Sequence, residues 1–234
     1  MQPKKIGILC AADTELAPFL PLIKPCAIAQ KAMLTFYEGN IGETPVVAAY
    51  SGVCRVNAAV ATQIMIDHFH VQAVVNAGTA GGMDPSVGLF DVVVAQKCAY
   101  HDLAEDILTE FHPWMPSVFF EADTALLAAA RRAAQSFEGT VWFGTVVTGE
   151  AFIEGPVREE IVRQFSPLAV DMETAGAAHV CYVNRIPFLS ARAVTDTPEH
   201  EGSAAFEQNC ERAAGISKDF VLQLLKELDD SSQP

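Results

Sequence analysis

Short runs of β-branched and other apolar residues alternate along this chain with segments of helical pattern, and this alternation limits its possible folds. Strands separated by helices of about 10 to 15 residues predict a mostly parallel sheet with helices on both faces. We therefore predict an α/β fold with a single domain over residues 1–234 and a mostly parallel, mixed central sheet. The expected strands are residues 5–11, 73–78, 91–100, 140–149, 168–172 and 187–196. The expected helices are residues 15–23, 55–69, 123–137, 156–165, a small-residue helix after 172, and 203–228.

Two further segments have local predictions. Residues 33–52 have the pattern of a β-hairpin, with its turn at Gly39 and Asn40, because these residue types favour tight turns. Residues 229–234 are predicted to be a frayed tail.

Charge and cysteine content exclude several classes of partner. The net charge of −14 argues against duplex nucleic acid and anionic membranes, since both favour a basic surface. The apolar run near the N-terminus is only about seven residues long, and no run approaches the ~20 residues of a membrane span, so we expect a cytoplasmic protein. The six cysteines are scattered without a C-x-x-C motif or a Cys/His cluster, which predicts reduced thiols and no metal site. No cofactor is expected.

Two carboxylates stand at the junction of a buried strand and a close-packed helix, in the stretch "AVDMETAGAAHV". Burying an ionised carboxylate costs several kcal/mol unless a partner compensates it. In an extended strand Asp171 and Glu173 would project to one face and Met172 to the other, unless the helix begins there. These carboxylates are therefore satisfied either by another protein group or by a ligand.

Ligands of open α/β sheets bind beyond the carboxyl ends of the strands, so the residues at these ends are candidates for a site. Glu15 follows the first strand, where a carboxylate is also favourable simply because it lies in the first turn of a helix. The stretch "NAGTAGG" ends a central strand, and its glycines allow close approach of a ligand or of another segment. It matches neither a dinucleotide fingerprint nor a P-loop.

Two more strand ends carry candidate residues. Phe152, beside Gly149 and Gly155, is either a core residue or a ring on which a flat base stacks. The strand "PFLSARAVTD" places Ser190, Arg192 and Asp196 on one face, with Arg192 and Asp196 about 13 Å apart. The alternative for Arg192 is an internal ion-pair network with Asp171 or Glu173.

The motifs "KIGILCAADTEL", "SGVCRVNAA", "NAGTAGG", "VTGEAFI", "VDMETAGAAHVC" and "RAVTD" occur together and in this order. This set resembles the 5′-methylthioadenosine/S-adenosylhomocysteine nucleosidases of the nucleoside phosphorylase superfamily. The resemblance covers the chain from about Lys5 to Leu228. It implies a nucleoside phosphorylase-like fold, a homodimer, and hydrolysis of an N-glycosidic bond with release of adenine.

The resemblance also implies roles for particular residues. Glu15 would activate the attacking water as general base, and Thr79 and Arg192 would help to position that water. Asp196 would deliver a proton to purine N7, which lets the base leave neutral. This requires a carboxyl group that stays protonated near neutral pH, as an enclosed apolar site favours. The remaining implied binding residues are Glu173 on the ribose hydroxyls, Met172 against the sugar, Phe152 on adenine, the Ile153 backbone on the base edge, and Phe206 on the ribose and its 5′ side.

Several positions depart from the family pattern, and two rival functions stay open. Ala12, Cys54, Arg55 and Asp171 stand where relatives have Met, Gly, Lys and Glu, and residues 103–120 lack the usual continuation after "YHD". The 5′ substituent is therefore open among methylthioadenosine, adenosylhomocysteine, 5′-deoxyadenosine and aminodeoxyfutalosine. A phosphate-dependent purine nucleoside phosphorylase is one rival, although Glu15 would repel phosphate. A non-catalytic nucleoside-sensing module is the other, although it would have no need for both Glu15 and Asp196.

Overall fold

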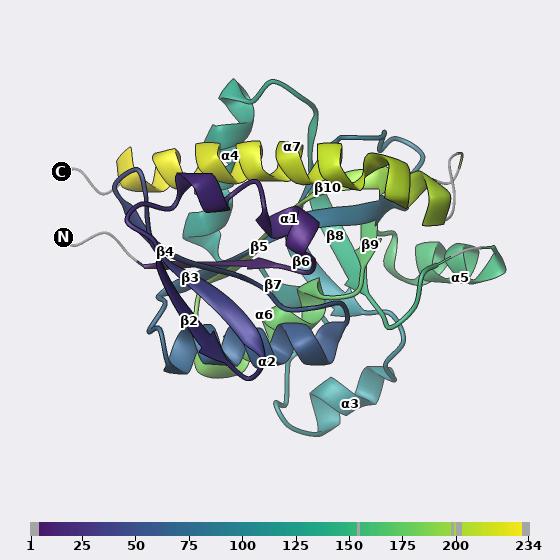
Figure 1. Ribbon diagram of the computed structural model, residues 1–234. Coiled ribbons are helices and arrows are strands. Elements are labelled where there is room, and N and C mark those ends of the chain that lie inside the picture. Colours follow the sequence, from purple (N-terminus) through teal and green to yellow (C-terminus); the bar gives the residue numbers. More distant parts are fainter. Residues whose placement is uncertain (1–4, 154, 198, 200–202, 231–234) are drawn as a thin grey trace.

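The computed structural model describes residues 5–153, 155–197, 199 and 203–230. Its strands join in one mixed sheet with helices on both faces, which confirms the predicted fold class (Figure 1). The strands are β1 (Ile6–Cys10), β2 (Ala27–Lys31), β3 (Leu34–Ile41), β4 (Thr44–Tyr50), β5 (Ala73–Gly82), β6 (Val92–Tyr100), β7 (Phe120–Glu121), β8 (Val141–Thr148), β9 (Ala169–Asp171) and β10 (Phe188–Asp196).

The strand order brings distant segments of the chain to the same edge of the sheet. Strand β1 lies between β4 and β5 and runs parallel to both. Strand β5 also pairs in parallel with β10 and in antiparallel fashion with β9, while β10 pairs with β6. Because β6 continues through β8 to β9, the five strands β10, β6, β8, β9 and β5 form a closed circuit. Strands β1, β5 and β10 therefore end close together.

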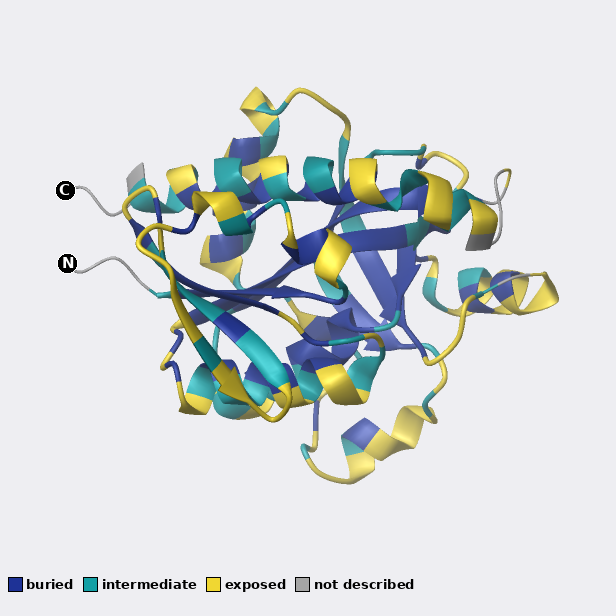
Figure 2. Ribbon diagram, in the orientation of Figure 1, coloured by how far each residue is buried: buried dark blue, intermediate teal, exposed yellow. Residues whose placement is uncertain are grey.

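The helices cover the sheet in two layers (Figure 1). Helices α1, α4 and α7 share one apolar cluster with the strands, and α2 and α6 share another on the opposite face. Figure 2 shows the consequence, since β1, β5, β9 and β10 are almost entirely buried, whereas β2 and the outer sides of the helices are exposed. The helices are α1 (Asp13–Leu16), α2 (Arg55–Asp67), α3 (Glu105–Glu110), α4 (Thr124–Ser136), α5 (Pro156–Phe165), α6 (Thr174–Asn184) and α7 (Ser203–Asp230), with a 3₁₀ turn, η1, at Leu20–Leu22.

Two local predictions are wrong. The helix expected over residues 15–23 is only the short α1 and the turn η1, because Pro18 and Pro21 remove amide donors within it. The hairpin turns at Gly42 and not at Gly39, and Gly42 has a φ of +59°. A Cβ at Gly39 would lie 1.9 Å from the carbonyl oxygen of Pro25. The absence of a side chain at Gly39 therefore lets these two segments pack closely together.

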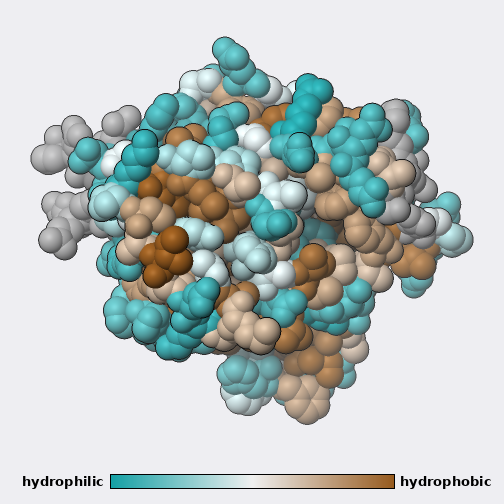
Figure 3. Space-filling view, in the orientation of Figure 1, coloured by the Kyte–Doolittle hydropathy of each residue, from teal (hydrophilic) through white to brown (hydrophobic). Residues whose placement is uncertain are grey.

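The ends and the surface of the chain complete the description. Helix α7 continues to Asp230, so the frayed tail predicted over residues 229–234 is wrong for residues 229 and 230, and residues 231–234 lie outside the described residues. All six cysteines are free thiols. Within the described ranges, no helix is both long and apolar enough to cross a membrane. Figure 3 shows apolar side chains interspersed with hydrophilic ones on one face of the molecule.

Candidate active site

All nine site residues predicted from the sequence line one hollow at the carboxyl ends of β1, β5, β9 and β10. The hollow encloses about 760 Å³, part of it open to solvent, which is ample for a nucleoside. Its lining consists of Ala11, Ala12, Glu15, Val53, Thr79, Ala80, Gly81, Ala151, Phe152, Ile153, Val170, Asp171, Met172, Glu173, Arg192, Thr195, Asp196 and Phe206. The sheet topology thus gathers side chains from seven separate segments.

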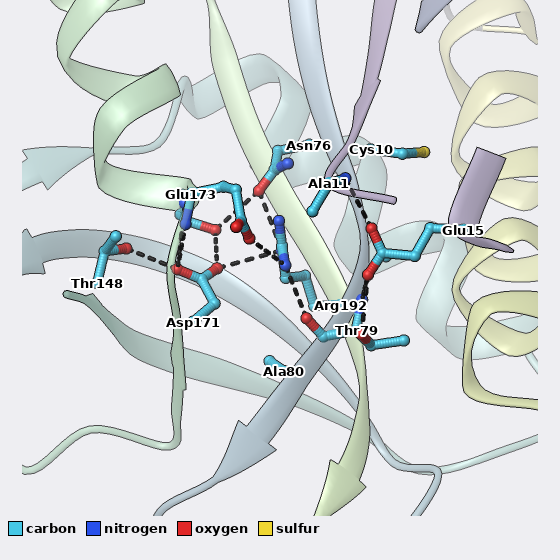
Figure 4. A network of polar contacts seen from close by, with 12 residues as sticks. Cys10, Ala11, Glu15, Asn76, Thr79, Ala80, Thr148, Asp171, Glu173 and Arg192 are labelled. Atoms are coloured by element: carbon cyan, nitrogen blue, oxygen red, sulfur yellow. Dashed lines mark hydrogen bonds and ion pairs between the residues drawn. The ribbon is translucent and has the colours of Figure 1, made fainter. Parts of the chain in front are cut away.

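Arg192 is the centre of a buried ion-pair network (Figure 4). Its Nε lies 3.1 Å from Asp171 Oδ2, and its Nη1 lies 3.1 Å from Glu173 Oε2. Nη1 also donates to the Thr79 carbonyl at 2.7 Å, and Nε donates to Asn76 Oδ1 at 3.1 Å. The internal network that the sequence left as an alternative therefore exists, and it forms one wall of the hollow.

The guanidinium of Arg192 stays charged in this network. Burial by itself lowers the pKa of Arg192, but the carboxylates of Asp171, Glu173 and Glu15 outweigh burial and hold the pKa above its ordinary value. Its Nη2 makes no hydrogen bond to the part of the chain that the structure describes.

Asp171 is held by protein groups on several sides. Its Oδ1 accepts the Thr148 hydroxyl at 2.6 Å and the backbone N–H groups of Glu173 and Thr174 at 3.2 and 3.1 Å. Its Oδ2 accepts the Thr174 hydroxyl in addition to the ion pair with Arg192. These contacts fix the start of α6 and hold Arg192 in place, so Asp171 supports its neighbours.

Glu173 lies at the N-cap position of α6 and is buried. Its Oε1 accepts the backbone N–H of Cys54 at 2.9 Å, while Oε2 faces Arg192. Burial raises the pKa of Glu173 to about 7, and the charges of Asp171 and Glu15 act in the same direction, while Arg192 and the Cys54 N–H lower it. Met172 also lines the hollow, so the alternation expected of an extended strand does not continue beyond Asp171, where β9 ends and the start of α6 follows.

Glu15 is oriented by four donors. Its Oε2 accepts the backbone N–H groups of Ala11 and Ala12 at 2.7 and 3.2 Å. Its Oε1 accepts both the N–H and the hydroxyl of Thr79 at 2.7 and 2.8 Å. A Cβ at Gly78 would lie 2.4 to 2.5 Å from this carboxylate, so only glycine fits beside it.

The far end of the hollow carries Asp196. The pairing of β10 with β5 shifts register between Val194 and Asp196, and this irregularity brings Thr195 into the lining, where a regular strand would turn it away. The Thr195 hydroxyl donates to Asp196 Oδ1 at 2.8 Å. Asp196 thus lines the same hollow as the buried network, at the end of the strand that carries Arg192.

Two aromatic rings form an edge of the hollow. The centroids of Phe152 and Phe206 are 5.7 Å apart, with planes at 75°. Phe152 is 54% exposed, which excludes the core interpretation that its sequence allowed. Ile153 packs instead on a small apolar cluster that includes Ile161 and Val170.

Comparison with known proteins places this geometry in a family. Residues 5–226 match the model of the Phosphorylase superfamily. A 5′-methylthioadenosine/S-adenosylhomocysteine nucleosidase from Geobacillus kaustophilus is 34% identical over 226 residues, which cover 94% of this chain and 96% of that protein. The chain belongs to this nucleosidase family.

Solved structures agree with the assignment. An S-adenosylhomocysteine nucleosidase from Streptococcus pyogenes, in complex with 5-methylthiotubericidin, has a TM-score of 0.90 and 28% identity, covering 97% of this chain and 98% of that chain. A futalosine hydrolase from Helicobacter pylori has a TM-score of 0.86 and 28% identity, covering 96% and 98% of the two chains. An S-adenosylhomocysteine nucleosidase and a futalosine hydrolase therefore share the fold of this chain.

Carboxyl groups outnumber basic side chains among the described residues that line this nucleosidase site. Four carboxyl groups, those of Glu15, Asp171, Glu173 and Asp196, face the hollow, and Arg192 is the one Lys or Arg among the lining residues that the structure describes. Such a site favours positive charge in a bound molecule and disfavours a free anion. In the described part of the chain, no group of three or more His, Cys, Asp or Glu residues has a metal-binding arrangement.

Asn76 and Thr148, which form hydrogen bonds with residues that line the hollow, were not identified from the sequence. Asn76 accepts from Arg192 and from Thr174, whose Oγ1 lies 2.8 Å from Asn76 Oδ1. Thr148 holds Asp171 and also accepts the N–H of Ala175 at 2.9 Å. A buried Asn inside the run "AVVNAG" was the available signal, because a buried polar side chain in an apolar strand needs partners.

Proposed function

We propose that this chain hydrolyses the N-glycosidic bond of 5′-methylthioadenosine, S-adenosylhomocysteine or a related 5′-substituted adenosine and releases adenine. The observation that carries the proposal is the gathering of Glu15, Glu173 and Asp196 around one hollow that Arg192 also lines. Cleavage of this bond develops positive charge on the ribosyl ring. Carboxylates that line the hollow stabilise this positive charge. Because the charge is larger in the transition state than in the ground state, their interaction lowers the barrier to bond cleavage.

The attacking water is assigned to Glu15. The four hydrogen bonds to its carboxylate fix its direction, and Thr79 and Arg192 lie beside it. Glu15 would take a proton from water as the water attacks the anomeric carbon. A positioned general base contributes about 10²–10⁴-fold to the rate.

The leaving base and the sugar are assigned to the remaining residues. Asp196 would protonate N7 of the purine, so that adenine leaves as a neutral molecule. Phe152 would stack on the base, the Ile153 backbone would bind its edge, and Glu173 would accept hydrogen bonds from the ribose hydroxyls. Met172 and Phe206 would then contact the sugar and its 5′ side.

Release of adenine from 5′-methylthioadenosine, measured with and without inorganic phosphate, tests this assignment. Hydrolysis predicts the same rate in both conditions, because Arg192, the basic side chain in the described lining of the hollow, is already paired with two carboxylates. A rate that requires phosphate would select the phosphorylase, and tight binding without adenine release would select the sensing module. Parallel assays with S-adenosylhomocysteine, 5′-deoxyadenosine and aminodeoxyfutalosine would identify the 5′ group.

We also infer that the chain forms a homodimer through the face made by α2 and α6. Val56 and Val60 of α2 are 68% and 43% exposed, and Tyr182 and Val183 of α6 are both 42% exposed. Val53, which lines the hollow, precedes these residues and is 49% exposed. Analytical ultracentrifugation should give twice the chain mass, and Val56→Asp should shift it toward one chain mass.

A further inference from the structure

The N-terminal end of α2 contacts both halves of the candidate active site. The backbone N–H of Cys54 donates to Glu173 Oε1 at 2.9 Å. The next N–H, that of Arg55, donates to Glu150 Oε1 at 3.2 Å. Glu173 belongs to the sugar side of the hollow, whereas Glu150 begins the segment that carries Phe152. One helix end therefore joins two segments that are far apart in the sequence.

The side chain of Arg55 strengthens this junction. Its Nε lies 2.8 Å from Glu150 Oε1, and its Nη1 lies 2.7 Å from Asp102 Oδ1. Asp102 Oδ2 in turn accepts the backbone N–H of Glu150 at 3.3 Å. Arg55, Asp102 and Glu150 thus form a closed ring of charge-assisted contacts, which are stronger and more directional than neutral ones.

Arg55 is also fixed from behind. A Cβ at Gly176 would lie 2.8 Å from the carbonyl oxygen of Arg55, so helix α6 packs directly against the Arg55 backbone. Because α6 begins next to Glu173, a displacement of Arg55 relative to α6 is resisted by backbone contact. The backbone of Arg55 is therefore held at a fixed position relative to Glu173, which belongs to the sugar side of the site.

The segment that carries Phe152 has apolar contacts through Ile153 and Phe206, but few polar contacts among the described residues. The active-site hollow lies on one side of residues 151–153, and a second hollow, which His101, Glu150 and Val157 help to line, lies on the other. Three sets of polar contacts hold residues 149–153 among the described residues. The Gly149 N–H donates to the Asp171 carbonyl at 3.1 Å, Arg158 Nη2 donates to the Ile153 carbonyl at 3.5 Å, and Glu150 makes the contacts given above. The contacts among Arg55, Asp102 and Glu150 are thus the ionic contacts that connect this segment to the region of Glu173.

We propose that Arg55 is a positioning residue, which sets the distance between the base-binding segment 149–153 and Glu173. This inference rests on the proposed function, because it concerns how base and sugar are held together during bond cleavage. A nucleoside bound at both points has its glycosidic bond oriented by this distance, and a misplacement of about 1 Å costs about 100-fold in rate. Free adenine would bind only to segment 149–153 and not to Glu173. Its affinity should therefore depend little on the distance between the two.

The three side chains of the ring are between 28% and 37% exposed, so their ion pairs contribute little to global stability. Loss of Arg55 should therefore change the kinetics more than the unfolding temperature. Arg55→Met removes the charge and keeps the aliphatic stem, while Arg55→Lys keeps the charge as a single ammonium group without the planar fork. Arg132→Met is the matched control, because the Arg132–Glu227 pair, at 3.0 Å, lies between α4 and α7.

The experiment compares these variants with the wild-type protein by adenine release, adenine inhibition and thermal unfolding. For Arg55→Met we expect kcat/KM for 5′-methylthioadenosine to fall about 10- to 100-fold, mainly in kcat, with adenine inhibition changed at most about threefold. The unfolding temperature should fall by at most about 4 °C. Arg55→Lys should recover most of the lost kcat, and Arg132→Met should match the wild type.

Three results would overturn the inference. The first is an unchanged kcat/KM in Arg55→Met. The second is an equal loss in adenine inhibition and in kcat/KM, since this would mean simple loss of the base site. The third is a fall in unfolding temperature well beyond that of the control, with full kcat retained at low temperature. Failure of the wild-type protein to release adenine would instead refute the proposed function, so the two failures are distinguishable.

Discussion

Glu173→Gln should change how the stability of the protein depends on pH. Glu173 is 3% exposed and shares Arg192 with Asp171, so burial and two neighbouring carboxylates oppose its ionisation. Its pKa in the folded protein is about 7, compared with 4.5 in a model compound. Gln keeps the size of the side chain and cannot ionise, so it imitates the protonated form at every pH.

The sign and size of the effect follow from these two pKa values. Between pH 4.5 and 7 the folded protein keeps the proton on Glu173, whereas the unfolded chain loses it. Stability that is fully present below pH 4.5 is therefore lost as the pH rises through 7. Each pH unit between the two pKa values corresponds to about 1.4 kcal/mol, so the total is about 3 kcal/mol, of which about 2 to 3 kcal/mol falls between pH 5 and pH 8.

Urea unfolding of both proteins at pH 5 and pH 8, at one fixed protein concentration, measures this difference. The free energy of unfolding of Glu173→Gln, relative to the wild type, should rise by about 2 to 3 kcal/mol from pH 5 to pH 8. Glu138→Gln, at an exposed position, should show no such rise. A relative stability that is the same at both pH values, or that falls, would mean that attraction to Arg192 outweighs burial.

Four further substitutions test other parts of the site. Asp196→Asn and Glu15→Gln should each lower kcat by at least about 100-fold while circular dichroism stays unchanged, and near wild-type turnover in either would remove that residue from the mechanism. Gly78→Ala should displace the Glu15 carboxylate, whose atoms lie 2.4 to 2.5 Å from the new Cβ; we expect about 1–3 kcal/mol of destabilisation in urea and loss of adenine release. Phe152→Ala should weaken adenine binding by about 1–3 kcal/mol in calorimetry with little change in unfolding temperature, because the ring is 54% exposed; an equal loss of stability would identify it as a packing residue.

Much of the fold and of the candidate site could be predicted from residue order. The alternation of apolar runs and helical segments predicts the mixed sheet, because each pattern repeats with the period of its own secondary structure. The rule that ligands bind beyond strand ends then selects the segments with Glu15, Glu173, Arg192 and Asp196, the family resemblance adds Thr79, and all five line one hollow. These predictions succeed because they depend on local pattern and on a general property of parallel strands.

Tertiary structure alone decided how those residues are held. Whether Arg192 meets Asp171, Glu173 or a ligand depends on the closed circuit of strands, and local periodicity contains no information about which strands become neighbours. The register shift in β10 and the helix end that joins Cys54 to Glu173 are likewise contacts between distant segments. The pKa of Glu173 follows from them, because burial and the balance of surrounding charge exist only once those segments are packed together.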